Sequence, residues 1–97
     1  MNYNISNRIL KELSFIAKEN CITRIILFGS RARGTHTERS DIDIAVSGGN
    51  FEKFYWQVMD KVHSLLTFDI VELDKGISKE LQDEIDNEGI VIYEKTR

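Results

Sequence analysis

The sequence predicts one small α/β (α+β) domain, in which a mixed four-stranded sheet has helices packed mainly on one face. Three observations lead to this fold class. Segments with helical spacing of apolar residues alternate with short β-rich runs along the chain. The 97 residues are too few for two ordinary domains. The chain also has no proline and no stretch that resembles a linker, so we expect a single domain over residues 1–97.

The first half of the chain predicts one helix and two strands. Apolar side chains at three- and four-residue spacing predict an amphipathic helix over 4–19. An isoleucine-rich run over 22–28 predicts the first strand, which ends at Gly29 and leads into a loop or short helix. Strict alternation of polar and apolar residues over 41–46 predicts the second strand.

The second half continues the alternation of helices and strands. Apolar residues at helical spacing predict a helix over 51–66, and the β-rich run 67–73 predicts the third strand. Apolar residues four apart predict a short helix within 77–88, and 90–93 reads as the fourth strand. Strands that alternate with helices indicate one sheet with helices packed on it.

Composition argues against several classes of protein. The chain has 13 basic and 16 acidic residues, a formal net charge of −3, and no basic stripe, so we expect no direct nucleic-acid binding. No apolar run approaches the ~20 residues that a membrane span needs, and we expect no membrane partner. The single cysteine, Cys21, excludes an internal disulfide and favours a cytoplasmic protein.

Two carboxylates, Asp41 and Asp43, stand two residues apart on the predicted second strand. Their side chains should therefore point to one face, with Ile42 and Ile44 on the other face toward the core. Two like charges on one face repel each other unless a cation lies between them, and magnesium prefers oxygen ligands of this kind. The alternative is that both are solvated strand residues.

Gly29 and Ser30 follow the first predicted strand directly. Glycine allows the backbone to approach a ligand closely, and serine is a good helix N-cap at a terminus that favours anions. An ordinary strand-to-helix turn would have the same residues. A phosphate cradle next to a carboxylate pair indicates phosphoryl or nucleotidyl transfer.

Asp69 is a candidate third carboxylate, because it lies between the apolar residues Phe68 and Ile70 and should project opposite to them. If its strand pairs beside 41–46, Asp69 joins the carboxylate pair on the same face. Three carboxylates could hold two magnesium ions, and Asp69 could also act as a general base. The alternative is a charge on an edge strand.

The spacing of Gly29-Ser30, ten further residues and Asp41-x-Asp43 resembles the signature of the DNA polymerase beta-like nucleotidyltransferase superfamily. The fuller stretch 29–45 resembles the minimal nucleotidyltransferase (MNT) proteins in particular. The resemblance extends over nearly the whole chain. It implies a nucleotidyltransferase core that uses ATP and magnesium.

The resemblance also implies roles for single residues. Gly29 and Ser30 would hold the nucleotide triphosphate. Arg33 is a further candidate for nucleotide binding, although it could equally pair with a nearby carboxylate such as Glu38. The implied catalytic and metal-binding residues are Asp41, Asp43 and Asp69.

The resemblance implies a partner as well. MNT proteins are often paired with a small helical HEPN protein in a toxin–antitoxin system, and the nucleotidyltransferase is the antitoxin. It acts by binding the HEPN toxin or by transferring AMP to a tyrosine of that toxin. The first alternative is a small-molecule, aminoglycoside-type nucleotidyltransferase that needs a partner subunit. The second alternative is a non-catalytic toxin-binding module.

The predicted carboxylate face continues into apolar residues, namely Ala45, Val71 and Leu73. With few helices available to cover the sheet, we expect part of this face to be bare. We expect this face, or the region 54–56 beside it, to dock the acceptor protein or a second copy in a homo-oligomer. A chain of 97 residues leaves little room for an acceptor-binding domain, which favours the same expectation.

Overall fold

A computed structural model describes residues 5–62 and 66–95 of the chain. In this part of the chain four strands form one mixed sheet in the order β3-β2-β1-β4. Strand β1 pairs antiparallel with β2 and β4, whereas β2 and β3 run parallel. The predicted mixed four-stranded sheet is confirmed. The strands are β1 (Arg24–Phe28), β2 (Ile42–Ser47), β3 (Phe68–Glu72) and β4 (Ile90–Glu94).

The helices fall where the apolar spacing predicts them. Helix α1 begins one residue after Ser6, whose side chain caps it by accepting a hydrogen bond from the backbone amide of Ile9. The helix predicted over 51–66 is too long: α3 ends at Lys61, because Val62 has an extended backbone and is its C-cap. Residues 63–65 of that prediction lie outside the described residues. The helices are α1 (Asn7–Glu19), the short α2 (Ser30–Arg33), α3 (Phe51–Lys61) and α4 (Lys79–Glu88), with a 3₁₀ turn η1 (Leu73–Lys75).

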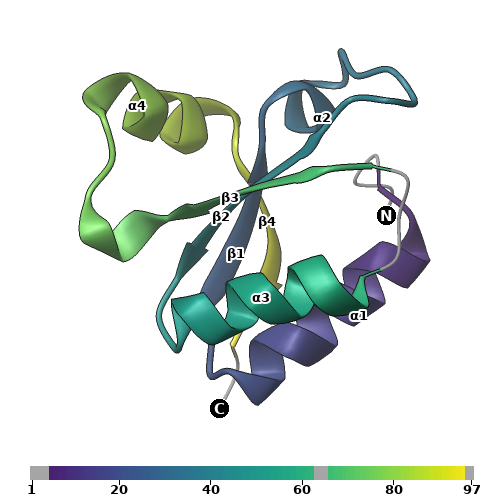
Figure 1. The fold of residues 1–97 in the computed structure, drawn as a ribbon. Helices are drawn as coiled ribbons and strands as arrows, with labels where there is room; N and C mark the ends of the chain where they lie inside the picture. Colours follow the sequence, from purple (N-terminus) through teal and green to yellow (C-terminus); the bar gives the residue numbers. More distant parts are fainter. Residues whose placement is uncertain (1–4, 63–65, 96–97) are drawn as a thin grey trace.

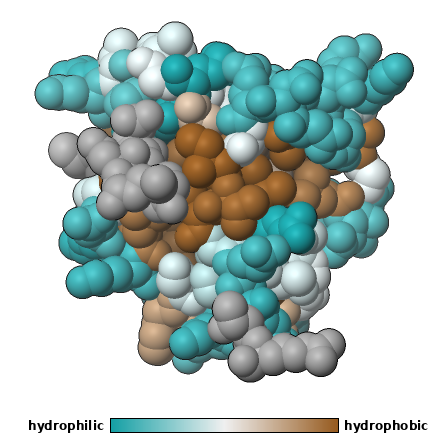
Figure 2. All heavy atoms as spheres, turned by 180° about the vertical axis from the view of Figure 1, so that it is seen from behind, coloured by the Kyte–Doolittle hydropathy of each residue, from teal (hydrophilic) through white to brown (hydrophobic). Residues whose placement is uncertain are grey.

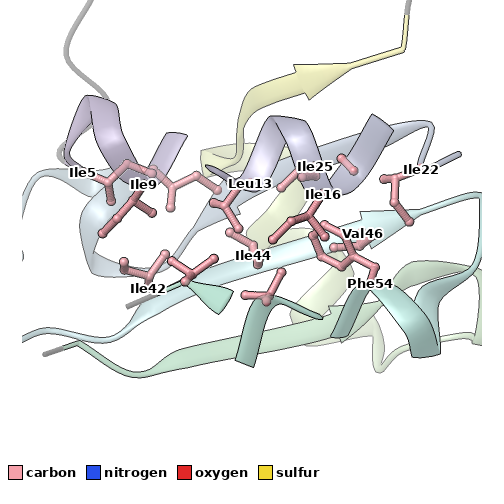
Figure 3. Packing of buried hydrophobic residues seen from close by; sticks show 14 residues of the cluster. Ile5, Ile9, Leu13, Ile16, Ile22, Ile25, Ile42, Ile44, Val46 and Phe54 are labelled. Carbon is pink, nitrogen blue, oxygen red and sulfur yellow. The ribbon is translucent and has the colours of Figure 1, made fainter. Parts of the chain in front are cut away.

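The main core lies between the sheet and the helices α1 and α3, which Figure 1 shows together on one side of the sheet. Leu13 of α1 and Phe54 of α3 are fully buried against strand residues such as Ile44. Figure 3 shows how closely these side chains interdigitate. Ile42 and Ile44 point into this core. Because side chains alternate between the two faces along a strand, Asp41 and Asp43 must face the opposite side of the sheet.

The opposite face of β2 is partly covered by α4, so the expectation that the apolar face at Ala45 is bare is wrong, whereas the docking of a partner on this side of the sheet stays a prediction. Ala45 is fully buried, and Val71 and Leu73 are half-buried in a small cluster around Ile85 of α4. The physical reason is that the segment 77–85 turns its own apolar side chains toward this face. Figure 1 shows α4 on the side of the sheet away from α1 and α3.

Apolar side chains also reach the surface. Figure 2 shows hydrophobic residues gathered on the side of the molecule seen from behind. Val91, on the edge strand β4, is 45% exposed, and Trp56 of α3 is 63% exposed. Among the described residues, no helix combines the length and the apolar character that a membrane crossing requires.

Candidate active site

The pairing of β2 with β3 brings two of the predicted carboxylates side by side. In the parallel register Asp43 lies directly opposite Asp69, and Ile44 lies opposite Ile70. The condition set for Asp69, that its strand pairs beside the second strand, is therefore met. Asp41 stands two residues before Asp43, immediately ahead of β2.

Asp41 is fixed in place from the start of β3. The hydroxyl group of Thr67 donates a hydrogen bond to the Oδ1 atom of Asp41. The backbone amide of Ile42 donates to the carbonyl oxygen of Thr67 at 2.9 Å. These two bonds join the residue before β3 to the residues that begin β2, and they hold the Asp41 carboxylate at this end of the sheet.

Gly29 brings the turn after β1 against the carboxylates. Phe28, the last residue of β1, lies opposite Asp43, and the next residue, Gly29, turns the chain with φ +74°. A methyl group at Gly29 would overlap the carboxylate of Asp43, so only glycine allows this approach. Gly29 itself is the N-cap of α2, and Ser30 is the first residue of the helix, so the N-cap role predicted for Ser30 is wrong.

Asp43 carries the electrostatic strain of the site. Partial burial, followed by the neighbouring charges of Asp69, Asp41 and Glu84, raises the pKa of Asp43 from the ordinary 3.8 to about 6. Arg33 acts in the opposite direction and lowers the pKa of Asp43. The excess of negative charge means that this face of the sheet favours a bound cation.

The two arginines of α2 differ in their surroundings. Arg33 is half-exposed and pairs with two carboxylates of α4, Glu84 at 3.4 Å and Glu88 at 3.7 Å. It therefore lies beside the carboxylate face, but its ionic partners belong to α4 and not to the loop that contains Glu38. Arg31 is buried and donates hydrogen bonds to backbone carbonyl groups of that loop.

The chemistry of the donors fits magnesium, although their present positions do not form a finished site. Within residues 5–62 and 66–95, no three acidic, histidine or cysteine side chains converge closely enough to hold an ion. Asp41, Asp43 and Asp69 nevertheless offer only carboxylate oxygens, the ligands that Mg²⁺ prefers. Partial burial raises the pKa of Asp43 most, and the repulsion from Asp69 and Asp41 raises it as well; a divalent cation would relieve this repulsion.

The carboxylate face is open to solvent, since Asp41 and Asp69 are both exposed. A cleft of about 870 Å³ lies at the other end of the sheet, between residues such as Asn20, Tyr55 and Trp56. None of the predicted site residues lines that cleft. The predicted carboxylates therefore lie outside that cleft, on the side of the sheet that α4 partly covers.

Two neighbours of the carboxylates could not be found by sequence reasoning. Thr67 anchors Asp41, but its position depends on the register of β2 and β3. Glu84 acts on Asp43 from α4, and nothing in the acidic pattern of that helix separates it from solvated neighbours. Both interactions join residues that are far apart in the sequence, so no local sequence pattern predicts them.

Comparison with known proteins identifies the family. The sequence pattern of the family described as polymerase beta, nucleotidyltransferase, matches residues 11–97. The chain belongs to the polymerase beta nucleotidyltransferase family. As a member of this family it is a nucleotidyltransferase, and the predicted family is confirmed. No curated protein sequence matches the chain.

Several solved structures share the nucleotidyltransferase fold of the chain. A toxin–antitoxin with AMP-PNP has 23% identity and a TM-score of 0.66, over 90% of this chain and 74% of that one. A tri-AMPylated HEPN toxin with its MNT antitoxin, from Shewanella oneidensis, has 19% identity and a TM-score of 0.63, over 94% and 74%. A toxin–antitoxin MntA–HepT has 19% identity and a TM-score of 0.61, over 93% and 74%.

The raised pKa of Asp43 predicts how pH affects the stability of the metal-free nucleotidyltransferase. Because the folded pKa is about 6 and the ordinary value is 3.8, the folded state holds the proton more tightly than the unfolded state does. This contribution to the free energy of unfolding is complete below about pH 4 and is lost as the pH rises through 6. We expect the melting temperature of the wild type, relative to Asp43→Asn, to fall between pH 5 and pH 7.

The measurement is thermal unfolding of both proteins in EDTA at constant ionic strength. Using the difference between the two proteins cancels the titration of the other carboxylates. A difference in melting temperature that stays constant over this pH range would contradict the assignment of a strained charge to Asp43.

Proposed function

We propose that the chain transfers AMP from ATP to a hydroxyl group, most simply a tyrosine, of a partner HEPN toxin, and thereby acts as an antitoxin. The observation that carries the proposal is the arrangement of Asp43 opposite Asp69 with the Gly29 turn against them. Membership of the nucleotidyltransferase family supports the reaction class. The solved toxin–antitoxin structures with this fold support the choice of partner.

The reaction assigns a role to each residue of the face. The acceptor hydroxyl oxygen attacks the α-phosphorus of ATP, the bond from this phosphorus to the bridging oxygen breaks, and pyrophosphate leaves. Asp69 accepts the proton of the hydroxyl group, while the Gly29-Ser30 turn and Arg33 hold the triphosphate. Magnesium bound by Asp41, Asp43 and Asp69 would neutralise phosphate charge and activate the hydroxyl group.

The open carboxylate face favours a protein acceptor over a small molecule. A small-molecule enzyme needs a pocket that encloses its substrate, and the described residues leave Asp41 and Asp69 exposed. A partner protein would bring its own wall and would hold the acceptor hydroxyl next to the phosphate, as in-line transfer requires. The Shewanella oneidensis structure pairs an MNT antitoxin with an AMPylated toxin, which supports the same arrangement here.

The decisive experiment uses ATP labelled at different phosphates. The purified chain is incubated with Mg²⁺ and a small helical candidate partner, with ATP labelled on either the α- or the γ-phosphate. We expect the label to reach a tyrosine of the partner from α-labelled ATP only. Labelling from the γ-phosphate would indicate phosphoryl transfer. Neutralisation of the toxin by an Asp43→Asn variant as well as by the wild type would favour a non-catalytic binding module.

Ser30→Ala should weaken nucleotide binding about tenfold, the usual effect of losing one hydrogen bond to a charged group. Because Gly29 and not Ser30 caps α2, the same change should leave the melting temperature nearly unchanged. The measurement is calorimetric titration with a non-hydrolysable ATP analogue and Mg²⁺. Ser47→Ala, at the far end of β2, is the matched control. Equal affinities for Ser30→Ala and the wild type would remove Ser30 from the nucleotide site.

A further inference from the structure

Arg31 is a buried arginine that reaches from α2 to the loop before the carboxylates. It is only 5% exposed, although it follows the partly exposed Ser30 directly. Its Nε atom donates to the carbonyl oxygen of Ser40 at 3.1 Å, and its Nη2 atom donates to the carbonyl oxygens of Thr37 and Glu38, at 3.3 Å each. One guanidinium group therefore holds three backbone carbonyl groups within four residues.

These carbonyl groups belong to a tight turn that ends at Asp41. The backbone amide of Ser40 donates to the carbonyl oxygen of Thr37 at 3.2 Å, and the amide of Thr37 donates to the Ser40 hydroxyl at 2.8 Å. Ser40 is bonded to Asp41, whose carboxylate is anchored on its other side by Thr67. Asp41 thus lies between a fixed turn and a fixed strand.

We propose that Arg31 is a positioning residue, which sets the 37–40 turn and through it the Asp41 carboxylate for metal binding. The proposal rests on the proposed magnesium-dependent function. The planar guanidinium group can direct several donors at carbonyl groups in fixed directions, whereas a lysine can supply the charge without this fork. A buried guanidinium that loses these acceptors would leave unsatisfied donors, so the turn and α2 form one unit.

This role differs from the one that an arginine next to a phosphate-binding turn would first suggest. The side chain of Arg31 lies beneath the loop and is used by backbone carbonyl groups, so it is not displayed to a nucleotide. The Gly29-Ser30 turn and Asp41 are the two halves of the sequence motif. Arg31 connects them, because it follows Ser30 directly and holds the turn that precedes Asp41. The ten residues between them act as a structural brace.

The test compares three variants, Arg31→Gln, Arg31→Lys and the control Arg39→Gln, whose side chain is exposed in the same turn. Mn²⁺ serves as the probe, and its affinity is measured by electron paramagnetic resonance in the presence of a non-hydrolysable ATP analogue. We expect Arg31→Gln to lose about tenfold or more in Mn²⁺ affinity, the usual cost of removing a residue that orients a metal ligand. We expect a smaller loss for Arg31→Lys and none for Arg39→Gln.

Hydrogen exchange supplies a second readout that does not depend on metal or activity. The amides of residues 37 and 40 should exchange faster in Arg31→Gln, while those of β1 keep their protection. If Arg31→Gln does not fold, the Arg31→Lys protein carries both measurements. Unchanged Mn²⁺ affinity in a folded Arg31 variant would overturn the proposal, as would unchanged exchange in the turn. Failure of the wild type to transfer AMP while it still binds Mn²⁺ would instead count against the proposed function.

Discussion

Replacing Asp43 by asparagine should abolish AMP transfer and, at the same time, stabilise the metal-free protein above pH 7. The loss of activity follows from the place of Asp43 at the centre of the carboxylate face, opposite Asp69 and against Gly29. A metal-bound charge stabilises a phosphoryl-transfer transition state by several kcal/mol, so we expect a loss of about a thousandfold or more. The gain in stability follows because the change removes a charge that is partly buried and is also repelled by neighbouring carboxylates.

Transfer is measured with α-labelled ATP, and stability by thermal unfolding in EDTA at pH 8. Asp60→Asn is the matched control, because Asp60 is an exposed carboxylate on α3, on the other side of the sheet. We expect this control to change neither quantity. Wild-type transfer by Asp43→Asn would refute the active-site assignment. Loss of transfer together with lower stability at pH 8 would indicate instead that Asp43 has a structural role.

The elements of this fold could be predicted because each one has its own periodicity. The alternation over 41–46 predicts that Ile42 and Ile44 are buried, and both are fully buried under α1 and α3. The same alternation places Asp41 and Asp43 on the other face. A single conditional step, that the strand carrying Asp69 pairs beside this strand, is enough to place Asp69 next to Asp43, and the parallel register meets that condition.

The sequence does not predict which helix covers which face of the sheet. The spacing of Ile77, Leu81 and Ile85 predicts a helix, but it does not say which face of the sheet the helix covers. The structure places it over Ala45, so this part of the face is not bare, contrary to the prediction from the sequence. For the same reason the sequence does not reveal that Glu84 acts on Asp43. When two side chains meet only because a helix packs on a particular face of the sheet, no local sequence pattern predicts their contact.

Arginines of the motif illustrate a second limit. Arg31 and Arg33 stand two residues apart in one short helix and have the same chemistry, so composition cannot separate them. The structure buries one among backbone carbonyl groups and pairs the other with carboxylates of α4. The turn of the helix decides between these outcomes, because residues two apart on a helix point in different directions.

A second large effect is expected from Gly29→Ala, a change of a single methyl group. Gly29 has φ +74° and ψ −157°, a region that only glycine adopts readily, so alanine there costs about 1–3 kcal/mol in the backbone alone. The added methyl group would also overlap the Asp43 carboxylate and displace it. A displaced reacting group commonly costs about a hundredfold in rate. We expect both a lower melting temperature and a loss of transfer of at least this size.

The variant Gly34→Ala separates the effect of backbone strain from the effect of overlap with the Asp43 carboxylate. Gly34 has φ +80° and ψ 14°, which a non-glycine residue can adopt at a cost of about 1–2 kcal/mol, and no atom lies within 4 Å of the added methyl group. We therefore expect Gly34→Ala to lower stability slightly and to retain transfer. The stability of Gly29→Ala is then measured again in an Asp43→Ala background, in a double-mutant cycle.

If the overlap with Asp43 is real, Gly29→Ala must be less destabilising once the carboxylate is gone, because only the backbone strain remains. Two equal costs in the two backgrounds would mean that the turn and the carboxylate do not touch. Transfer by Gly29→Ala at the rate of Gly34→Ala would mean that the close approach of the turn to Asp43 has no part in catalysis. The cycle therefore tests, with stability alone, the contact between the Gly29 turn and Asp43 on which the proposed active site depends.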